Sequence, residues 1–184
     1  QLEQNDFLNI PYNEQIKIKN EHIRSVFFKQ NIDAQINPIL TADQPTHYRH
    51  KVTVSATNIK MNKKLQIKFG FFIENTHKIK PKFESILHDQ TIEKLLNDTE
   101  SILQKKRFTA YVKGHNRGII KHVLVRKSYA TNDLLMVFVT QGHIFPNHKE
   151  IIKEILKLNH DVKTVVQIIQ NTETPIVLYG EEKV

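Results

Sequence analysis

Residues 46–55 read Thr-His-Tyr-Arg-His-Lys-Val-Thr-Val-Ser, and Tyr, Val and Thr in this stretch favour a β-strand. Successive side chains of a strand point to opposite faces. One predicted face therefore carries Tyr48, His50, Val52 and Val54, and the other carries Arg49, Lys51, Thr53 and Ser55. The first face can be buried. The second offers two cations and two hydroxyls, which suits a sugar-phosphate backbone better than a protein core.

The following segment repeats this alternation and predicts a hairpin. Lys64, Gln66 and Lys68 alternate with Leu65, Ile67, Phe69 and Phe71, after a polar connection over residues 57–63. Residues 44–73, the first basic window, hold six Lys or Arg residues and no Asp or Glu. A solvated face on which lysines protect an edge strand is the alternative interpretation. The complete absence of acids favours a nucleic-acid surface, on which Lys64 and Lys68 are expected to lie beside Arg49 and Lys51 across the hairpin.

A second basic window, residues 101–132, holds eight Lys or Arg residues and again no acid. The segments 1–43, 74–100 and 133–184 are each mildly acidic, although the whole chain has a net charge of +8. Two basic windows on an otherwise mildly acidic chain are typical of nucleic-acid binding. An anionic membrane surface is the competing partner, but neither window has the pattern of a basic amphipathic helix.

Within the second window, Gly114 and Gly118 bracket a predicted turn that displays Arg117. In the strand that follows, Lys121 lies on one face, and His122 and Arg126 lie on the other. We expect this turn and strand to contact RNA. The alternative is an exposed turn with charges at a strand end, and His122 is also compatible with a buried, hydrogen-bonded position.

The sequence lacks the residues that several classes of function require. The chain has no cysteine, which removes thiolate chemistry, disulfides and most structural zinc sites. His47 and His50 would point to opposite faces of a strand, so no metal site is expected. We find no glycine-rich phosphate loop, nucleophile elbow or paired carboxylates, and hence no candidate catalytic residue. Without a membrane-length apolar run or a signal peptide, we expect a cytoplasmic protein and no membrane partner.

The overall pattern predicts an α+β fold with a mainly antiparallel sheet and about three helices. The helices are expected over residues 12–30, over 89–105 with Asp89 as N-cap, and over 147–158 with a capping box of Asn147 and Glu150. Beyond the hairpin, strands are expected near residues 76–79, 108–112, 119–126, 134–141, 162–169 and 175–179.

Several motifs together resemble the RNA uracil-C5 methyltransferases that modify tRNA or 23S rRNA. The resemblance is carried, in order, by Tyr48-Arg49-x-Lys51, the upstream stretch 8–19, Gly70-Phe-Phe with Thr76-His77, Gly118-Ile-Ile-Lys-His122 with Arg126, residues 136–140, and the strand pair 165–180. No single motif is specific, but their order and spacing cover the whole chain. The sequence departs from the family pattern at His50, where Asn is usual, and at Lys121, where Arg is usual.

The resemblance implies that residues 1–184 form the central RNA-recognition domain of a larger enzyme. Residues 9–35 would pack on its methyltransferase domain. The Rossmann-like catalytic domain, which would hold S-adenosylmethionine and the nucleophilic cysteine, and the TRAM domain are both expected to be absent here. The cysteines that bind an iron–sulfur cluster in many members have no counterpart, which implies a member without a cluster and no cofactor in this chain.

The expected function is RNA recognition for an S-adenosylmethionine-dependent RNA (uracil-5-)-methyltransferase acting on rRNA or tRNA, with no catalysis by the isolated chain. A free-standing RNA-binding or ribosome-associated protein is the alternative. The helix over residues 12–30 is expected to dimerise, to contact another neighbour or to be poorly ordered. The predicted RNA-binding residues are Arg49, Lys51, Lys64, Lys68, Arg117, Lys121, His122 and Arg126.

Overall fold

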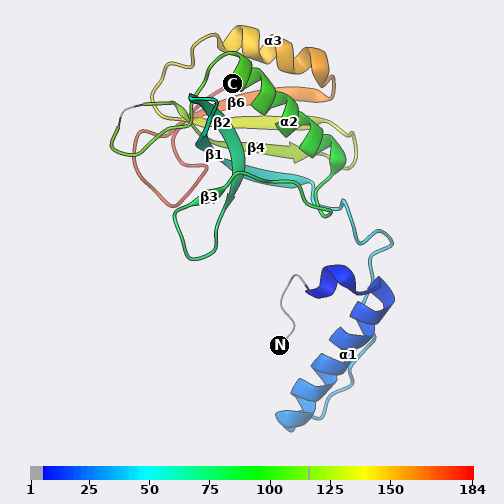
Figure 1. Cartoon of the computed structure of the whole chain (residues 1–184). Coiled ribbons are helices and arrows are strands. Elements are labelled where there is room, and N and C mark those ends of the chain that lie inside the picture. Colours follow the sequence, from blue (N-terminus) through cyan, green and yellow to red (C-terminus); the bar gives the residue numbers. More distant parts are fainter. Residues whose placement is uncertain (1–5, 116) are drawn as a thin grey trace. The chain divides into compact units, whose positions relative to one another are not determined.

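The computed structural model describes residues 6–115 and 117–184 (Figure 1). The chain divides into two compact units, Gln1–Pro45 and Thr46–Val184. Each unit is considered by itself.

The first unit is a helix with an extended return segment. A short 3-10 helix, η1 (Asp6–Asn9), precedes α1 (Tyr12–Lys29), which begins directly after Pro11 as expected. The amide of Gln15 donates hydrogen bonds to the carbonyl oxygens of Phe7 and Ile10, at 2.8 and 2.9 Å, and so ties η1 to α1. The predicted helix over residues 12–30 is confirmed, and none of the residues of α1 is buried.

The second unit is built on a seven-stranded sheet with the order β3-β2-β1-β4-β5-β6-β7. The strands are β1 (Lys51–Met61), β2 (Lys64–Phe72), β3 (Ile79–Lys80), β4 (Ile120–Lys127), β5 (Leu134–Thr140), β6 (Val162–Ile169) and β7 (Glu181–Lys183). Every neighbouring pair is antiparallel except β5 and β6, which run parallel. The predicted α+β class with a mainly antiparallel sheet is confirmed.

Helices α2 (Gln90–Lys105) and α3 (His148–Leu158) cover one face of this sheet (Figure 1). Their apolar stripes pack with Val52, Val54 and other inward side chains in the main core. We call the opposite side the helix-free face. It carries a smaller apolar cluster of Leu124, Val137, Val139 and Ile168, against which Val177 packs.

Helix α2 combines a strong apolar stripe with an effective N-cap. The carboxylate of Asp89 accepts hydrogen bonds from the backbone N–H groups of Thr91 and Ile92, which confirms the predicted cap. Two polar side chains of α2 reach the backbone of β2. The Glu100 carboxylate accepts from the N–H of Phe69 at 2.6 Å, and the Gln104 amide donates to the carbonyl of Ile67 at 2.8 Å.

Helix α3 connects the two parallel strands β5 and β6, as a crossover between parallel strands requires. The predicted capping box at its start is wrong. Asn147 has left-handed backbone angles, with φ of 54°, and its side chain makes no capping hydrogen bond. The helix nevertheless begins there, because Ile151 and Ile155 are fully buried against the sheet.

Strand β1 starts later and ends later than its sequence predicts. It begins at Lys51, so Tyr48 lies before the strand, and it continues through residues 57–61, which the sequence assigns to a connection. Asn62 and Lys63 alone form the turn into β2, both with positive φ as a two-residue hairpin turn requires.

Two short strands expected from sequence, near residues 108–112 and 175–179, do not form, and side-chain amides bond to the backbone in both segments. The amide of Asn58 donates to the carbonyl of Ala110 and accepts from its N–H, at 2.9 and 2.8 Å, within the segment 108–112. Likewise, the amide of Gln170 donates to carbonyl oxygens at Ile176, Val177 and Tyr179. The backbone of 108–112 is also paired through two isolated bridges, of Ala110 with Ile120 and of Val112 with Arg117, which do not extend into a strand.

Candidate nucleic-acid interface

The register of β1 and β4 brings the two basic windows together at one point. Lys51 of β1 lies directly opposite Arg126 of β4. Val52 follows Lys51 and Val125 precedes Arg126, and both valines are buried in the main core. Because adjacent side chains of a strand point to opposite faces, both cations extend from the helix-free face. Both side chains are exposed, and neither forms an ion pair with any residue in 6–115 or 117–184.

Arg49 lies just before Lys51 on a well-anchored piece of backbone. Its N–H donates to the carbonyl of Leu87 at 2.8 Å, and its own carbonyl accepts from the N–H of Asp89 at 3.0 Å. The side chain is exposed and has no ion-pair partner among the described residues. Arg49 is thus a further exposed cation two residues before Lys51, and we call Arg49, Lys51 and Arg126 the candidate basic cluster.

Lys64 and Lys68 do not join this cluster. Lys64 lies opposite Met61 at the hairpin turn, at the other end of the long strand β1 from Lys51. The ammonium of Lys68 donates to the nearly buried carboxylate of Glu100 at 2.7 Å. The sequence prediction that both lysines lie beside Arg49 and Lys51 is therefore wrong in placement. Their contribution to RNA binding stays a prediction.

Arg117 and Lys121 lie near the other end of β4. Arg117 is exposed, in the turn whose backbone pairs it with Val112. The ammonium of Lys121 donates to the backbone and side-chain oxygens of Gln170, at 2.7 and 3.3 Å, and lies 4.8 Å from the centre of the Tyr111 ring. Burial lowers the pKa of Lys121. This lysine is held by internal contacts, whereas Arg117 is open to solvent.

His122 is a largely buried histidine on the helix-free face. It lies opposite Ser55, and its Nδ1 is 3.0 Å from the Ser55 hydroxyl. Burial, together with the positive charge of Lys121, lowers the pKa of His122 to about 4. The imidazole is therefore neutral at neutral pH and presents no positive charge to a phosphate.

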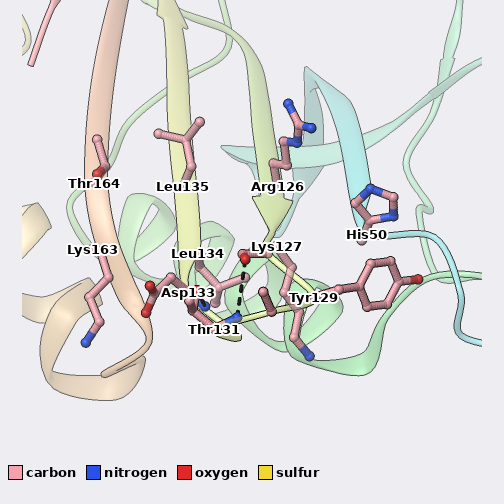
Figure 2. A pocket seen from close by; sticks show the side chains of 12 residues that line it. His50, Arg126, Lys127, Tyr129, Thr131, Asp133, Leu134, Leu135, Lys163 and Thr164 are labelled. Carbon is pink, nitrogen blue, oxygen red and sulfur yellow. Dashed lines mark hydrogen bonds between the residues drawn. The ribbon is translucent and has the colours of Figure 1, made fainter.

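A hollow of about 610 Å³ opens beside the candidate basic cluster, where β4 turns into β5 (Figure 2). Arg126 lines it together with His50, Tyr129, Asp133 and Lys163. Neither Tyr129 nor Lys163 was among the residues expected from sequence. The sequence signal that could have identified Tyr129 is its position inside the polar turn 128–133, since such a turn gives an aromatic ring no core to enter.

Metal and membrane sites find no support in the part of the chain that the structure describes. No cluster of three or more His, Asp or Glu side chains there could hold a metal ion. Within the same residues, no helix combines the length and apolar character needed to span a bilayer.

Comparison with known proteins relates the chain to RNA methyltransferases. It is 30% identical over 179 residues to an uncharacterized RNA methyltransferase of Oceanobacillus iheyensis, covering 96% of the chain and 38% of that relative. An uncharacterized RNA methyltransferase of Lactiplantibacillus plantarum is 27% identical over 171 residues, which cover 92% of the chain and 36% of the relative. The chain thus spans less than two fifths of the length of these two relatives. No family model matches the chain.

A solved structure shares the fold. The crystal structure of the Pyrococcus abyssi tRNA (uracil-54, C5)-methyltransferase in complex with S-adenosyl-L-homocysteine superimposes with a TM-score of 0.67. The match covers 96% of this chain and 39% of that enzyme, at 12% sequence identity. The sequence similarity to the two relatives agrees with the resemblance to RNA methyltransferases that the motifs predict, and the solved structure shows a shared fold.

Proposed function

We propose that this chain is the RNA-recognition part of an S-adenosylmethionine-dependent RNA (uracil-5-)-methyltransferase acting on rRNA or tRNA. The observation that carries the proposal is the similarity to RNA methyltransferases over 96% of the chain, in which the family-like residues Arg49, Lys51 and Arg126 are all exposed and Lys51 lies opposite Arg126. Phosphate contacts from such cations position an RNA without reading its sequence.

The same proposal places methyl transfer outside these 184 residues. Uracil-C5 methylation by the family uses a cysteine nucleophile, and the chain has no cysteine. The unit β5–α3–β6, which joins two parallel strands, has one glycine, Gly142, in the connection before the helix. This connection does not fit the glycine-rich loop that the family resemblance implies for S-adenosylmethionine, so no step is assigned to that molecule here.

The test measures binding of a tRNA and an rRNA hairpin to the chain across a range of salt concentrations. If phosphate contacts dominate, each lost cation reduces the slope of log K against log salt by roughly one. We expect Arg49→Ala combined with Lys51→Ala to weaken binding and to flatten this slope. The Arg126→Ala variant should act in the same direction.

The matched control removes two exposed lysines from α3, on the opposite face of the sheet. Lys153→Ala with Lys157→Ala changes the net charge equally and should leave the salt slope unaltered. If the Arg49 and Lys51 double variant behaves like this control, the basic cluster does not contact RNA. If no RNA binds the unmodified chain even at low salt, the proposed function fails.

A further inference from the structure

The hollow at the β4–β5 turn has features that the basic cluster alone does not explain. Its wall is formed by the ends of β4 and β5, the turn 128–133, and Lys163 and Thr164 of β6 (Figure 2). An aromatic ring and cations thus line the same open cavity. This combination suits a ligand that has both a flat apolar face and a negative charge.

The ring of Tyr129 is held in position although it is 63% exposed. Its hydroxyl donates a hydrogen bond to the backbone carbonyl of Tyr48. The ring also lies against the imidazole of His50, with 4.7 Å between ring centres and 51° between ring planes. Contacts at the hydroxyl end and with His50 fix the orientation of the ring, while much of its surface stays accessible. An oriented, exposed ring is the usual platform for stacking an unpaired base.

The cations of the hollow differ in their availability. Lys127 is bound to the Asp89 carboxylate at 2.8 Å and is not free for a ligand. Arg126 and Lys163 are exposed, and no acid lies in ion-pair range of either among the described residues. The ammonium of Lys163 donates to the carbonyl of His160 at 3.2 Å, which leaves it two further donors. Two lining cations, Arg126 and Lys163, are therefore available to a ligand, and the hollow is lined by one acid, Asp133.

We propose that this hollow holds one unpaired nucleotide of a single-stranded RNA segment. Its base stacks on Tyr129 and its phosphate is bound by Arg126, while Lys163, at the other end of the hollow, is available to the neighbouring phosphate of the RNA strand. The inference rests on the proposed function and names a subsite next to the basic cluster. It selects single-stranded RNA, because a base inside a duplex has both faces covered by its stacked neighbours. The exposed ring beside the cations favours a nucleotide over a phosphate ion alone.

The test compares a short single-stranded RNA with a fully paired RNA duplex by fluorescence anisotropy at fixed salt. Loss of one base–aromatic stack corresponds to a roughly tenfold to hundredfold weaker affinity. Tyr129→Leu should cause a loss of this size for the single strand and little change for the duplex. Tyr129→Phe keeps the ring face and loses only the bond to Tyr48, so its effect should be smaller.

Lys163→Gln should weaken single-strand binding, whereas Lys153→Gln on α3 is the matched control and should not. A second readout uses RNA that contains 5-iodouridine, which photocrosslinks to stacked aromatic side chains. Mass spectrometry should locate a crosslink at Tyr129 in the unmodified chain.

The possible results distinguish failure of this inference from failure of the proposed function. If the unmodified chain binds RNA but Tyr129→Leu binds the single strand equally well and no crosslink maps to Tyr129, the subsite is wrong and the proposed function stands. Competition by inorganic phosphate as effective as competition by uridine monophosphate would show an anion site without base stacking, and would also overturn the inference. A chain that binds no RNA contradicts both proposals.

Discussion

His122 is a partly buried residue of the helix-free face, and its protonation affects the stability of the fold. Its pKa falls from an ordinary value of 6.5 to about 4, first because it is buried and second because Lys121 is close. Between these two pH values the unfolded chain binds a proton that the folded chain excludes. The free energy of unfolding must therefore decrease as the pH falls from 6.5 towards 4. Burial lowers the pKa of His88 too, which adds a contribution of the same sign.

We expect His122→Gln to reduce this pH dependence. Glutamine can keep a hydrogen bond to Ser55 but does not titrate, so the part due to His122, up to about 3 kcal/mol by pH 4, should disappear. Urea denaturation at pH 7 and at several values down to pH 4 measures the effect. The contribution of His88 should remain in both proteins. If the free energy of unfolding changed equally with pH in the two proteins, His122 would be protonated as readily in the folded chain as in the unfolded chain, and the prediction would be wrong.

At the scale of secondary-structure elements, α1 differs from the other two helices. Helices α2 and α3 bury their apolar stripes, whereas α1 has no buried residue. Within α1, Ile23 is 41% exposed and Val26 is 38% exposed. A helix with an accessible apolar stripe is a candidate interaction surface.

We expect α1 to mediate association with a second copy of the chain or with a methyltransferase domain. In the first case, sedimentation of the purified chain should show a dimer that increases with concentration. Ile23→Gln with Val26→Gln should shift it towards the monomer. Leu156→Gln with Leu158→Gln removes two exposed apolar side chains from α3 and is the control. Purely monomeric behaviour at all concentrations would argue against self-association through α1.

At the scale of the whole molecule, the residues that form the two apolar clusters all belong to the second unit, 46–184. The described chain is thus a folded sheet unit with a helical segment before it. It corresponds to less than two fifths of the length of the two RNA methyltransferases reported above. Under the proposed function, the site of S-adenosylmethionine lies outside these residues.

We therefore expect the 184-residue chain not to bind S-adenosylmethionine specifically. Calorimetric titration with the methyl donor should give no saturable heat at micromolar concentrations. A control titration with adenosine, which shares the base and the ribose of the donor, should give the same negative result. Saturable binding of the donor alone would place its site within this chain and would refute the assignment of methyl transfer to other residues.

The sequence predicted the long elements well, because their periodicity is strong. The helix over residues 89–105 and the strand over 162–169 match α2 and β6 closely. The strands expected near residues 108–112 and 175–179 do not form, and side chains from outside these segments bond to the backbone in both. No local pattern reveals that Asn58 would satisfy the backbone of Ala110, fifty-two residues away.

Prediction of the site had the same limit. Both basic windows are visible in the sequence, but the contact of Lys51 with its neighbour Arg126 depends on the register of two strands far apart in the chain. Lys68 satisfied the sequence pattern as well as Lys51 did. It differs because the nearly buried carboxylate of Glu100 binds it from another element.

The contacts of Glu100 and Gln104 with β2 also affect how the molecule behaves among its own copies. Strand β3 pairs with β2 only at Phe71 and Phe72, so much of that side of β2 has no neighbouring strand. An uncovered strand edge is a template for addition of a strand from another molecule and hence for aggregation. Here the N–H of Phe69 and the carbonyl of Ile67 already have partners on α2. A second chain would have to displace both side chains before it could extend the sheet, so the helix that completes the core also protects the protein against edge-to-edge polymerisation.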